Sequence, residues 1–547
     1  INNNAKYKII YMPKTVNRLT RKTPTGDTMM PTKLSGRRAA RSRPGRRRWL
    51  PVIIGLIVGL VGGAALAGSY PPPSTDMIKV QATSWYQHMR QLLVPRDSAG
   101  TRTWVGDPQI FADPPIALPP DPESDAELID DDVAELIDVN APAPDAQQLS
   151  SALDEAMAAL SLQHRMVVVD AATGETLYDR GGNDPVVPAS TLKLFTGINL
   201  LHHLDTTHRF VTAAHYGPTE GVTLVGGGDG LLALGESTGE TVGYAGLADL
   251  AAKTWDAIGD EVTTAGHATV EVHVDVSRYH GPWLHPDWTE GLQAAGWVSP
   301  VYPLNVYGGF TGHPAYSDTA VEDGAAVAAG TFTRHLNDLA AAAGAAVEFT
   351  YAGQTTQPSE AAQVAEVRSA PVGQQLEYAM KQSNNMLLEM FGREAALAAH
   401  ASPDFAGSTQ ATMTTLGELG IDTQQLGFAD NSGLSPRSRA TLHTTVDLFE
   451  LMLTEEQYRP LLDTLTVAGY DGTMRYRMTE APYSGIVRTK TGTLEVASSN
   501  AGLTVTEDGR ALWFAINTTG GDGDYEATRA EQDHLAEVLT ACGCTPE

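Results

Sequence analysis

Strand patterns occur near both ends of the globular part of this chain, and helical patterns fill much of the stretch between them. At the N-terminal end, residues 166–170 and 175–178 predict two strands joined by a turn containing Gly174. Three more strand patterns follow one another between residues 486 and 516, and a helical pattern covers 526–542. Strands at both ends of a helical middle predict one sheet built from N- and C-terminal segments.

A long stretch of mixed pattern interrupts this arrangement. Residues 209–368 contain alternating strand and helix patterns, including a helix expected over 332–346 and irregular loops over 281–310. We therefore predict an α/β insertion over 209–368 within a discontinuous main domain, which comprises residues 148–208 and 369–547.

A run of glycines, Gly226-Gly227-Gly228, follows one of these strand patterns. It lacks both the Gly-Lys-Ser/Thr ending of a phosphate loop and the spacing of a dinucleotide-binding turn. We therefore interpret it as a tight turn.

The charge is distributed very unevenly along the chain. The net charge is −28, yet residues 1–68 are strongly basic. An acidic globular part argues against binding to nucleic acid. We predict a disordered basic N-terminus over 1–48 and a proline-rich, acidic linker over 69–147.

Residues 49–68 lie between these two parts. They include no charged side chain and directly follow several arginines, a pattern typical of a transmembrane anchor with the arginines on the cytoplasmic side. Ala65-Leu66-Ala67 fits a signal-peptidase site, so a cleaved signal segment is the alternative. Either interpretation places the remainder of the chain outside the cytoplasm, membrane-anchored or secreted.

Cysteines and histidines give little sign of metal chemistry. The two cysteines, Cys542 and Cys544, are separated by one residue, and we expect them to be incidental thiols because a disulfide across one residue would be strained. No residues show metal-ligand spacing, so we predict neither a metal nor a cofactor.

Ser190 and Lys193 form a Ser-x-x-Lys motif at the start of an apolar helical pattern. Residues three apart share a helix face, which brings an amine next to a hydroxyl. A buried lysine with a lowered pKa can take the proton of the serine and make it nucleophilic. Unpaired N–H groups at the helix start could stabilise an oxyanion.

Two later stretches add to this motif: Ser383-Asn384-Asn385 between helical patterns, and Lys490-Thr491-Gly492-Thr493 on an apolar strand. Taken alone, the first would be a helix cap and the second an ordinary edge strand. Together and in this order, the three resemble the Ser-x-x-Lys, Ser-x-Asn and Lys-Thr-Gly set of penicillin-binding proteins and serine β-lactamases.

The long insertion narrows the resemblance to the low-molecular-mass class C penicillin-binding proteins, which are D-alanyl-D-alanine carboxypeptidases/endopeptidases. Residues 224–229, 430–435 and 468–475 also resemble that family, although Pro436 stands where the family often has a basic residue. The resemblance implies an α/β (α+β) fold: a penicillin-binding/β-lactamase-type domain with an antiparallel sheet flanked by helices. It also implies peptidoglycan stem peptides as substrates and β-lactams as covalent inhibitors.

The resemblance further implies a role for each motif residue. Ser190 would be the acylated nucleophile, Lys193 its base, and Ser383 the proton relay to the departing amine. The remaining positions would bind substrate, with an amide at Asn385 and a carboxylate site formed by Lys490, Thr491 and Thr493. Gly492 would allow close approach to the strand, and the N–H groups of Ser190 and Thr493 would form the oxyanion hole.

Two alternatives differ in chemistry. A β-lactamase of class A would need a Glu-x-x-Leu-Asn loop, which the sequence lacks. A non-catalytic wall-binding relative would not need Ser190, Lys193 and Lys490 intact. We interpret four further charged residues as parts of ion pairs or turn caps: Asp430, Arg437, Arg439 and Asp471.

Overall fold

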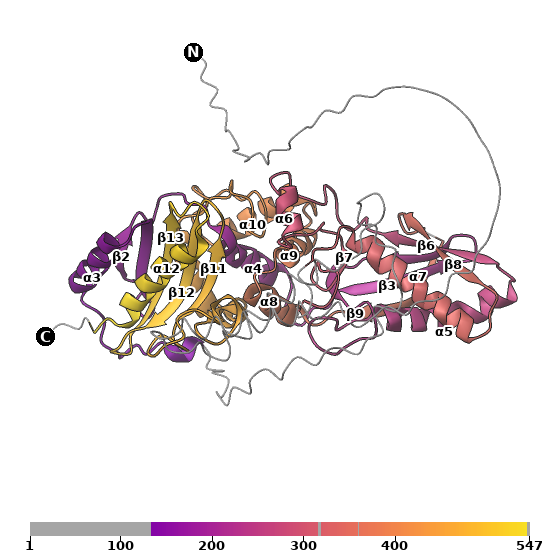
Figure 1. The fold of residues 1–547 in the computed structure, drawn as a ribbon, viewed down its shortest axis with the longest axis horizontal. Coiled ribbons are helices and arrows are strands. Elements are labelled where there is room, and N and C mark those ends of the chain that lie inside the picture. The colour runs from indigo at the N-terminus through magenta and orange to yellow at the C-terminus, as the bar shows by residue number, and fades with distance from the viewer. Residues whose placement is uncertain (1–132, 315–318, 359, 544–547) are drawn as a thin grey trace, which may run out of the picture. The chain divides into compact units, whose positions relative to one another are not determined.

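A computed structural model describes residues 133–314, 319–358 and 360–543 of the chain. Its main sheet has six strands, in which each neighbouring pair is antiparallel. In spatial order these are β10 (Thr466–Val467), β11 (Arg488–Thr493), β12 (Ser498–Val505), β13 (Ala511–Thr519), β1 (Gln163–Asp170) and β2 (Thr176–Arg180). The N-terminal strand β1 therefore lies against the C-terminal strand β13 (Figure 1), which confirms the predicted sheet.

Side chains of β1 are buried on both faces of this sheet. Met166 and Val168 join the core under α3 (Ala146–Ala159) and α12 (Tyr525–Thr540). Val167 and Val169 join the larger core on the other face. This two-sided burial explains why β1 is a continuous apolar run in the sequence rather than an alternating one.

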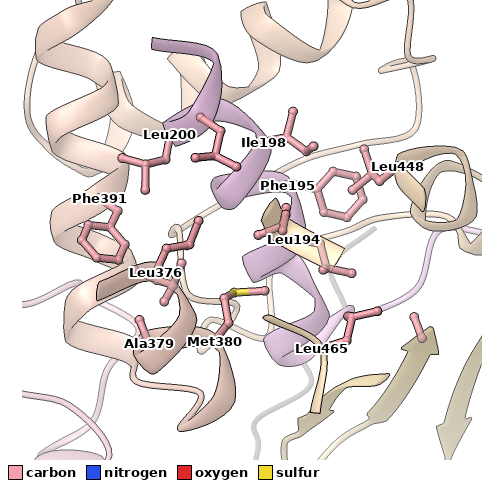
Figure 2. Close-up of a cluster of buried hydrophobic side chains, with 14 of the residues drawn as sticks. Leu194, Phe195, Ile198, Leu200, Leu376, Ala379, Met380, Phe391, Leu448 and Leu465 are labelled. Carbon is pink, nitrogen blue, oxygen red and sulfur yellow. The ribbon is translucent and has the colours of Figure 1, made fainter. Parts of the chain in front are cut away.

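Helices of the larger core surround one almost fully buried helix, α4 (Leu192–His203). Figure 2 shows its side chains Leu194, Phe195 and Ile198 among residues from other helices, such as Leu376, Phe391 and Leu448. The helices of this core are α8 (Val372–Lys381), α9 (Asn385–Ala398), α10 (Phe405–Glu418) and α11 (Leu442–Thr454), with the 3₁₀ turn η4 (Arg459–Thr464). An antiparallel sheet flanked by helices is the predicted fold class, which is thus confirmed.

A second sheet lies within residues 209–368 and has its own hydrophobic core. Its five strands are, in spatial order, β8 (Glu348–Gln354), β6 (Thr269–Asp275), β4 (Gly221–Val225), β3 (Val211–Gly217) and β9 (Ala362–Arg368). Two helices pack on it, α5 (Leu247–Thr264) and α7 (Gly324–Ala342), and a small parallel pair β5 (Asp229–Leu232) and β7 (Leu304–Val306) lies nearby.

Two expectations about this region need correction. The helix expected over 332–346 begins eight residues earlier, because Asp323 caps α7 by accepting from the Ala326 N–H. The loops expected over 281–310 include the short helix α6 (Glu290–Ala294) and strand β7.

The glycine run at 226–228 connects β4 to β5. A Cβ atom at Gly227 would lie 1.8 Å from the Val211 carbonyl oxygen, and Gly228 has a φ of 104°. Close backbone approach therefore requires glycine here. The backbone geometry of these glycines agrees with the tight turn that the sequence predicts.

The predicted linker over 69–147 is not solvated along its whole length. Its described part includes the 3₁₀ turn η2 (Val133–Leu136), where Val133 is fully buried in the larger core. Arg510 donates to the carbonyl oxygens of Val139 and Ala141 and so fastens this segment to the main sheet. Burial of Val133 and the hydrogen bonds from Arg510 hold this segment against the domain, although its acidic composition predicts a solvated chain.

Two further expectations concern the chain ends. Cys542 is disulfide-bonded, so the interpretation as incidental thiols is wrong; the other cysteine, Cys544, lies outside the described residues. Within the described ranges no helix is long and apolar enough to cross a membrane. The predicted basic N-terminus (1–48) and apolar segment (49–68) lie outside those ranges.

Candidate active site

Ser190 lies in a short 3₁₀ turn, η3 (Ala189–Thr191), that leads directly into α4. Two glycines make room for this turn. A Cβ atom at Gly433 would lie 1.8 Å from the Ala189 carbonyl oxygen, and one at Gly492 would lie 2.5 Å from the Ser190 nitrogen. Ala189 itself adopts a left-handed backbone with a φ of 47°, a conformation that is rare for residues with a side chain. Gly492 therefore admits the Ser190 backbone against β11, a role in addition to the substrate approach that we predicted.

Lys193 is fully buried beneath Ser190. Its Nζ donates three hydrogen bonds of 2.7 Å, to Ser190 Oγ, Asn385 Oδ1 and the Ser432 carbonyl oxygen. Burial lowers the pKa of Lys193 to about 7, against the opposing attraction of Asp430 and Glu389. Lys193 is therefore partly neutral near pH 7, and in its neutral form it can accept the proton of the adjacent Ser190 hydroxyl.

A second serine and lysine pair faces the first. Lys490 on β11 is fully buried, and its Nζ donates to Ser383 Oγ at 3.0 Å and to the Thr491 carbonyl oxygen at 2.8 Å. Burial, together with the charge of Lys193, lowers the pKa of Lys490 well below its usual value. Ser383 has a φ of 51°, so its backbone is also held in the left-handed region.

The amide of Asn385 is engaged on both sides within the protein. Its Oδ1 accepts from Lys193, and its Nδ2 donates to the Trp297 carbonyl oxygen at 2.7 Å. Asn385 therefore holds Lys193 and ties α9 to the inserted region, in addition to any contact with substrate.

Hydroxyls extend the site along β11. Thr491 Oγ1 lies 2.7 Å from Thr473 Oγ1, and Thr493 Oγ1 lies 3.1 Å from Ser498 Oγ. Thr473 belongs to the 3₁₀ turn η5 (Gly472–Met474) and was not among the predicted site residues. The segment containing it resembles the family, but no charge or spacing singles out this threonine.

Glu389 is the other residue that the sequence did not reveal. It is fully buried on α9, and its carboxylate accepts from the N–H groups of Asn431 and Ser432 and from Asn431 Nδ2. Burial, followed by the charge of Asp430, raises the pKa of Glu389 to about 7. Glu389 thus fixes the turn whose Ser432 carbonyl oxygen binds Lys193. Its position four residues after Asn385, within an apolar helix, is the only signal in the sequence.

The four charged residues interpreted as ion pairs or caps do have such contacts. Asp430 accepts from the N–H groups of Gly433 and Ser435 and from the Trp288 indole, so it caps the turn. Arg437 pairs with Asp287, and Asp471 pairs with Lys381 at 2.8 Å. Arg439 donates to carbonyl oxygens of its own loop.

One cleft opens over Ser190, Ser383 and Asn385. It runs along Thr491, Gly492 and Thr493 of β11, and Trp297 of the inserted region lines its opposite side. All eight predicted site residues are therefore brought together, six at the cleft surface and two lysines beneath it. In the described ranges no group of three acidic, histidine or cysteine side chains is arranged to hold a metal.

Known proteins resemble the chain over most of this structure. A family model described as the D-Ala-D-Ala carboxypeptidase 3 (S13) family matches residues 146–317 and 311–542. Carboxypeptidase DacB of Mycolicibacterium smegmatis is 33% identical over 424 residues, covering 75% of this chain and 87% of that protein. D-alanyl-D-alanine carboxypeptidase of Actinomadura sp. is 28% identical over 457 residues, covering 68% and 80% respectively.

A solved structure, penicillin-binding protein 4 (dacB) from Haemophilus influenzae, superposes with a TM-score of 0.57 at 19% identity. The superposition covers 72% of this chain and 99% of that one. At this identity the likeness concerns the fold, and it supports a penicillin-binding/β-lactamase-type arrangement of the main sheet.

A substitution of the buried Glu389 tests whether its carboxylate stabilises the turn at Asn431 and Ser432. At pH 5, where Glu389 is uncharged because burial raises its pKa to about 7, replacing it by leucine should lower the free energy of unfolding by about 2 kcal/mol, because the buried N–H donors of Asn431 and Ser432 lose their acceptor. Denaturant unfolding followed by tryptophan fluorescence measures the change. Glu377→Leu is the matched control, because Glu377 forms only a half-exposed pair with Lys381 on α8. Equal stability of the two variants would contradict the role assigned to Glu389.

Proposed function

The chain belongs to the D-Ala-D-Ala carboxypeptidase 3 (S13) family, and from this premise we propose that it cleaves D-alanyl-D-alanine bonds of peptidoglycan stem peptides through an acyl-enzyme on Ser190. The family makes the protein a serine-type D-Ala-D-Ala carboxypeptidase. The observation that carries the residue assignment is the three-oxygen cage around the buried Lys193, one oxygen of which is Ser190 Oγ.

The first half of the proposed reaction forms the acyl-enzyme. Ser190 Oγ attacks the carbonyl carbon of the scissile bond while its proton passes to Lys193 Nζ, 2.7 Å away. The carbonyl oxygen becomes an oxyanion beside the N–H groups of Ser190 and Thr493. The C–N bond then breaks, and Ser383, held by Lys490, delivers a proton to the departing amine. The proton that Lys193 took from Ser190 replaces the one that Ser383 gave, so Lys193 is neutral again before the second half of the reaction.

The second half releases the product. Water attacks the ester carbon, its proton passes to Lys193, and Ser190 leaves with a proton restored. The terminal carboxylate of the substrate would be held by Thr491 and Thr493, which line the cleft, with the charge of Lys490 buried beneath them. A β-lactam would acylate Ser190 in the same way. Penicillin-binding protein 4 from Haemophilus influenzae has also been solved in complex with a β-lactam.

We further propose that residues 49–68 direct the chain to the cell-wall side of the membrane, either as an uncleaved anchor or as a cleaved signal. The sequence supports this proposal through its uncharged run preceded by arginines, and the substrate itself lies outside the cytoplasm.

Fractionation of cells that express the chain with a C-terminal tag should find it in the membrane or the medium. Deletion of residues 37–68 should leave it in the cytoplasm. A tagged full-length chain found in the cytoplasm would contradict the proposal. N-terminal sequencing distinguishes the anchor from the cleaved signal.

Removal of the nucleophile tests the assignment directly. Ser190→Ala should abolish both labelling by fluorescent penicillin and D-alanine release from a pentapeptide, a loss of about 10³-fold or more. Ser151→Ala is the matched control, because Ser151 is an exposed serine on α3. Retained labelling in Ser190→Ala would contradict the assignment. Rapid release of the bound penicillin by the unaltered protein would instead favour a β-lactamase.

Acylation should also depend on pH in a defined direction. Lys193 acts as a base only when neutral, and its pKa is lowered to about 7. The second-order rate of penicillin acylation should therefore rise by about tenfold between pH 6 and pH 8 and then level off. Stopped-flow fluorescence measures the rate, and circular dichroism at each pH verifies the fold. A flat profile, or one that falls with pH, would contradict Lys193 as the base.

A further inference from the structure

The charge of the cleft is opposite to that of the protein. The chain carries a net charge of −28, yet the charged side chains that line the cleft around Ser190 within the described ranges are two arginines, Arg477 and Arg529. The two lysines of the site lie beneath the same surface. A cleft lined in this way attracts anionic groups.

Contacts between neighbouring residues connect Thr491 to both arginines. The Thr491 hydroxyl contacts Thr473 of η5, and Arg477 follows in the same segment. Arg477 forms an ion pair of 2.6 Å with Asp533 on α12, and Arg529 lies one helical turn before Asp533. The arginines therefore line the same cleft as Thr491 and Ser383, and in the proposed reaction Ser383 gives a proton to the leaving amine.

The two arginines differ in their partners. Arg477 is half-buried, and two of its guanidinium nitrogens donate to the two carboxylate oxygens of Asp533. Arg529 is exposed to the cleft, and no acidic side chain of the described residues forms a salt bridge with its guanidinium. Burial and the charge of Arg477 lower the pKa of Arg529, against the opposing attraction of Asp533 and Glu526. An anion bound at this point would relieve the repulsion between the two cations.

We propose that Arg529, beside Arg477, binds a free carboxylate of the leaving peptide and so favours cleavage of cross-links. The proposal rests on the proposed function and extends it to the leaving group. When a terminal bond is cleaved, the leaving group is a single D-alanine, whose one carboxylate is accounted for at Lys490 and Thr491. When a cross-link is cleaved, the leaving group is a second stem peptide, which reaches further and carries carboxylates of its own.

The test compares Arg529→Ala with the unaltered chain on two purified substrates, a pentapeptide that releases D-alanine and a cross-linked dimer. We expect the variant to release D-alanine with kcat and KM within twofold of the unaltered chain. On the dimer we expect KM to rise about fivefold with little change in kcat, the size of effect that a partly exposed charge pair gives. Arg529→Lys should recover part of the loss. Arg368→Ala is the matched control, because Arg368 is an exposed arginine on β9 of the second sheet.

A chemically altered substrate gives a second, independent test. A dimer whose acceptor-stem carboxylates are amidated should be cleaved equally well by the unaltered chain and by Arg529→Ala. Equal losses on pentapeptide and dimer would overturn the proposal, because Arg529 would then bind the terminal D-alanine carboxylate. Unchanged kinetics on the dimer, or a dimer that the unaltered chain leaves intact, would also overturn it. Failure of the unaltered chain to release D-alanine is a separate result, which would refute the proposed function itself.

Discussion

The removal of Lys193 from water is the constraint on which the rest of this site depends. A buried ammonium is costly unless oxygens replace its hydration shell, and a neutral amine still needs partners. Three segments far apart in the sequence supply those oxygens: Ser190 from η3, Asn385 from the first turn of α9, and Ser432 from a turn fixed by Glu389. The core around α4 holds these segments together, so the packing of the domain sets the basicity of one amine.

The second buried lysine follows from the first. Two ammonium groups in one buried site repel each other, and burial together with the charge of Lys193 lowers the pKa of Lys490. Each lysine donates to one serine hydroxyl, so the site contains two serine–lysine pairs, Ser190–Lys193 and Ser383–Lys490. In the reaction that we propose, one pair takes up a proton as the other gives one to the amine. The low dielectric of the site favours this pairing, because it disfavours two positive charges at once.

The sequence predicts those parts of the structure that depend on local pattern. The apolar run of β1 and the three C-terminal strands predict the main sheet, and three short motifs predict all eight residues brought together at the cleft. Glu389 and Thr473 escape prediction because their roles depend on tertiary contacts, with Asn431 and Thr491 respectively, that leave no periodicity in the chain. The burial of Val133 also depends on tertiary contacts, so the acidic composition around it does not predict that burial. The disulfide at Cys542 is not predicted from the sequence, because the spacing of the two cysteines indicates strain in a short loop.

The inserted region is bound into the catalytic arrangement rather than attached to its outside. The Trp297 carbonyl oxygen accepts from Asn385, and the Gly308 carbonyl oxygen accepts from Asn384 at 3.0 Å. On the other side of the site, the Trp288 indole donates to Asp430, which caps the turn that carries Ser432. These contacts fix Asn385, the residue before it, and the turn that carries Ser432. In the reaction that we propose, the insertion therefore contributes to the geometry of proton transfer as well as to the walls of the cleft. Any change in its loops that moves Trp297 or Trp288 would therefore act on the rate of acylation and on substrate binding together.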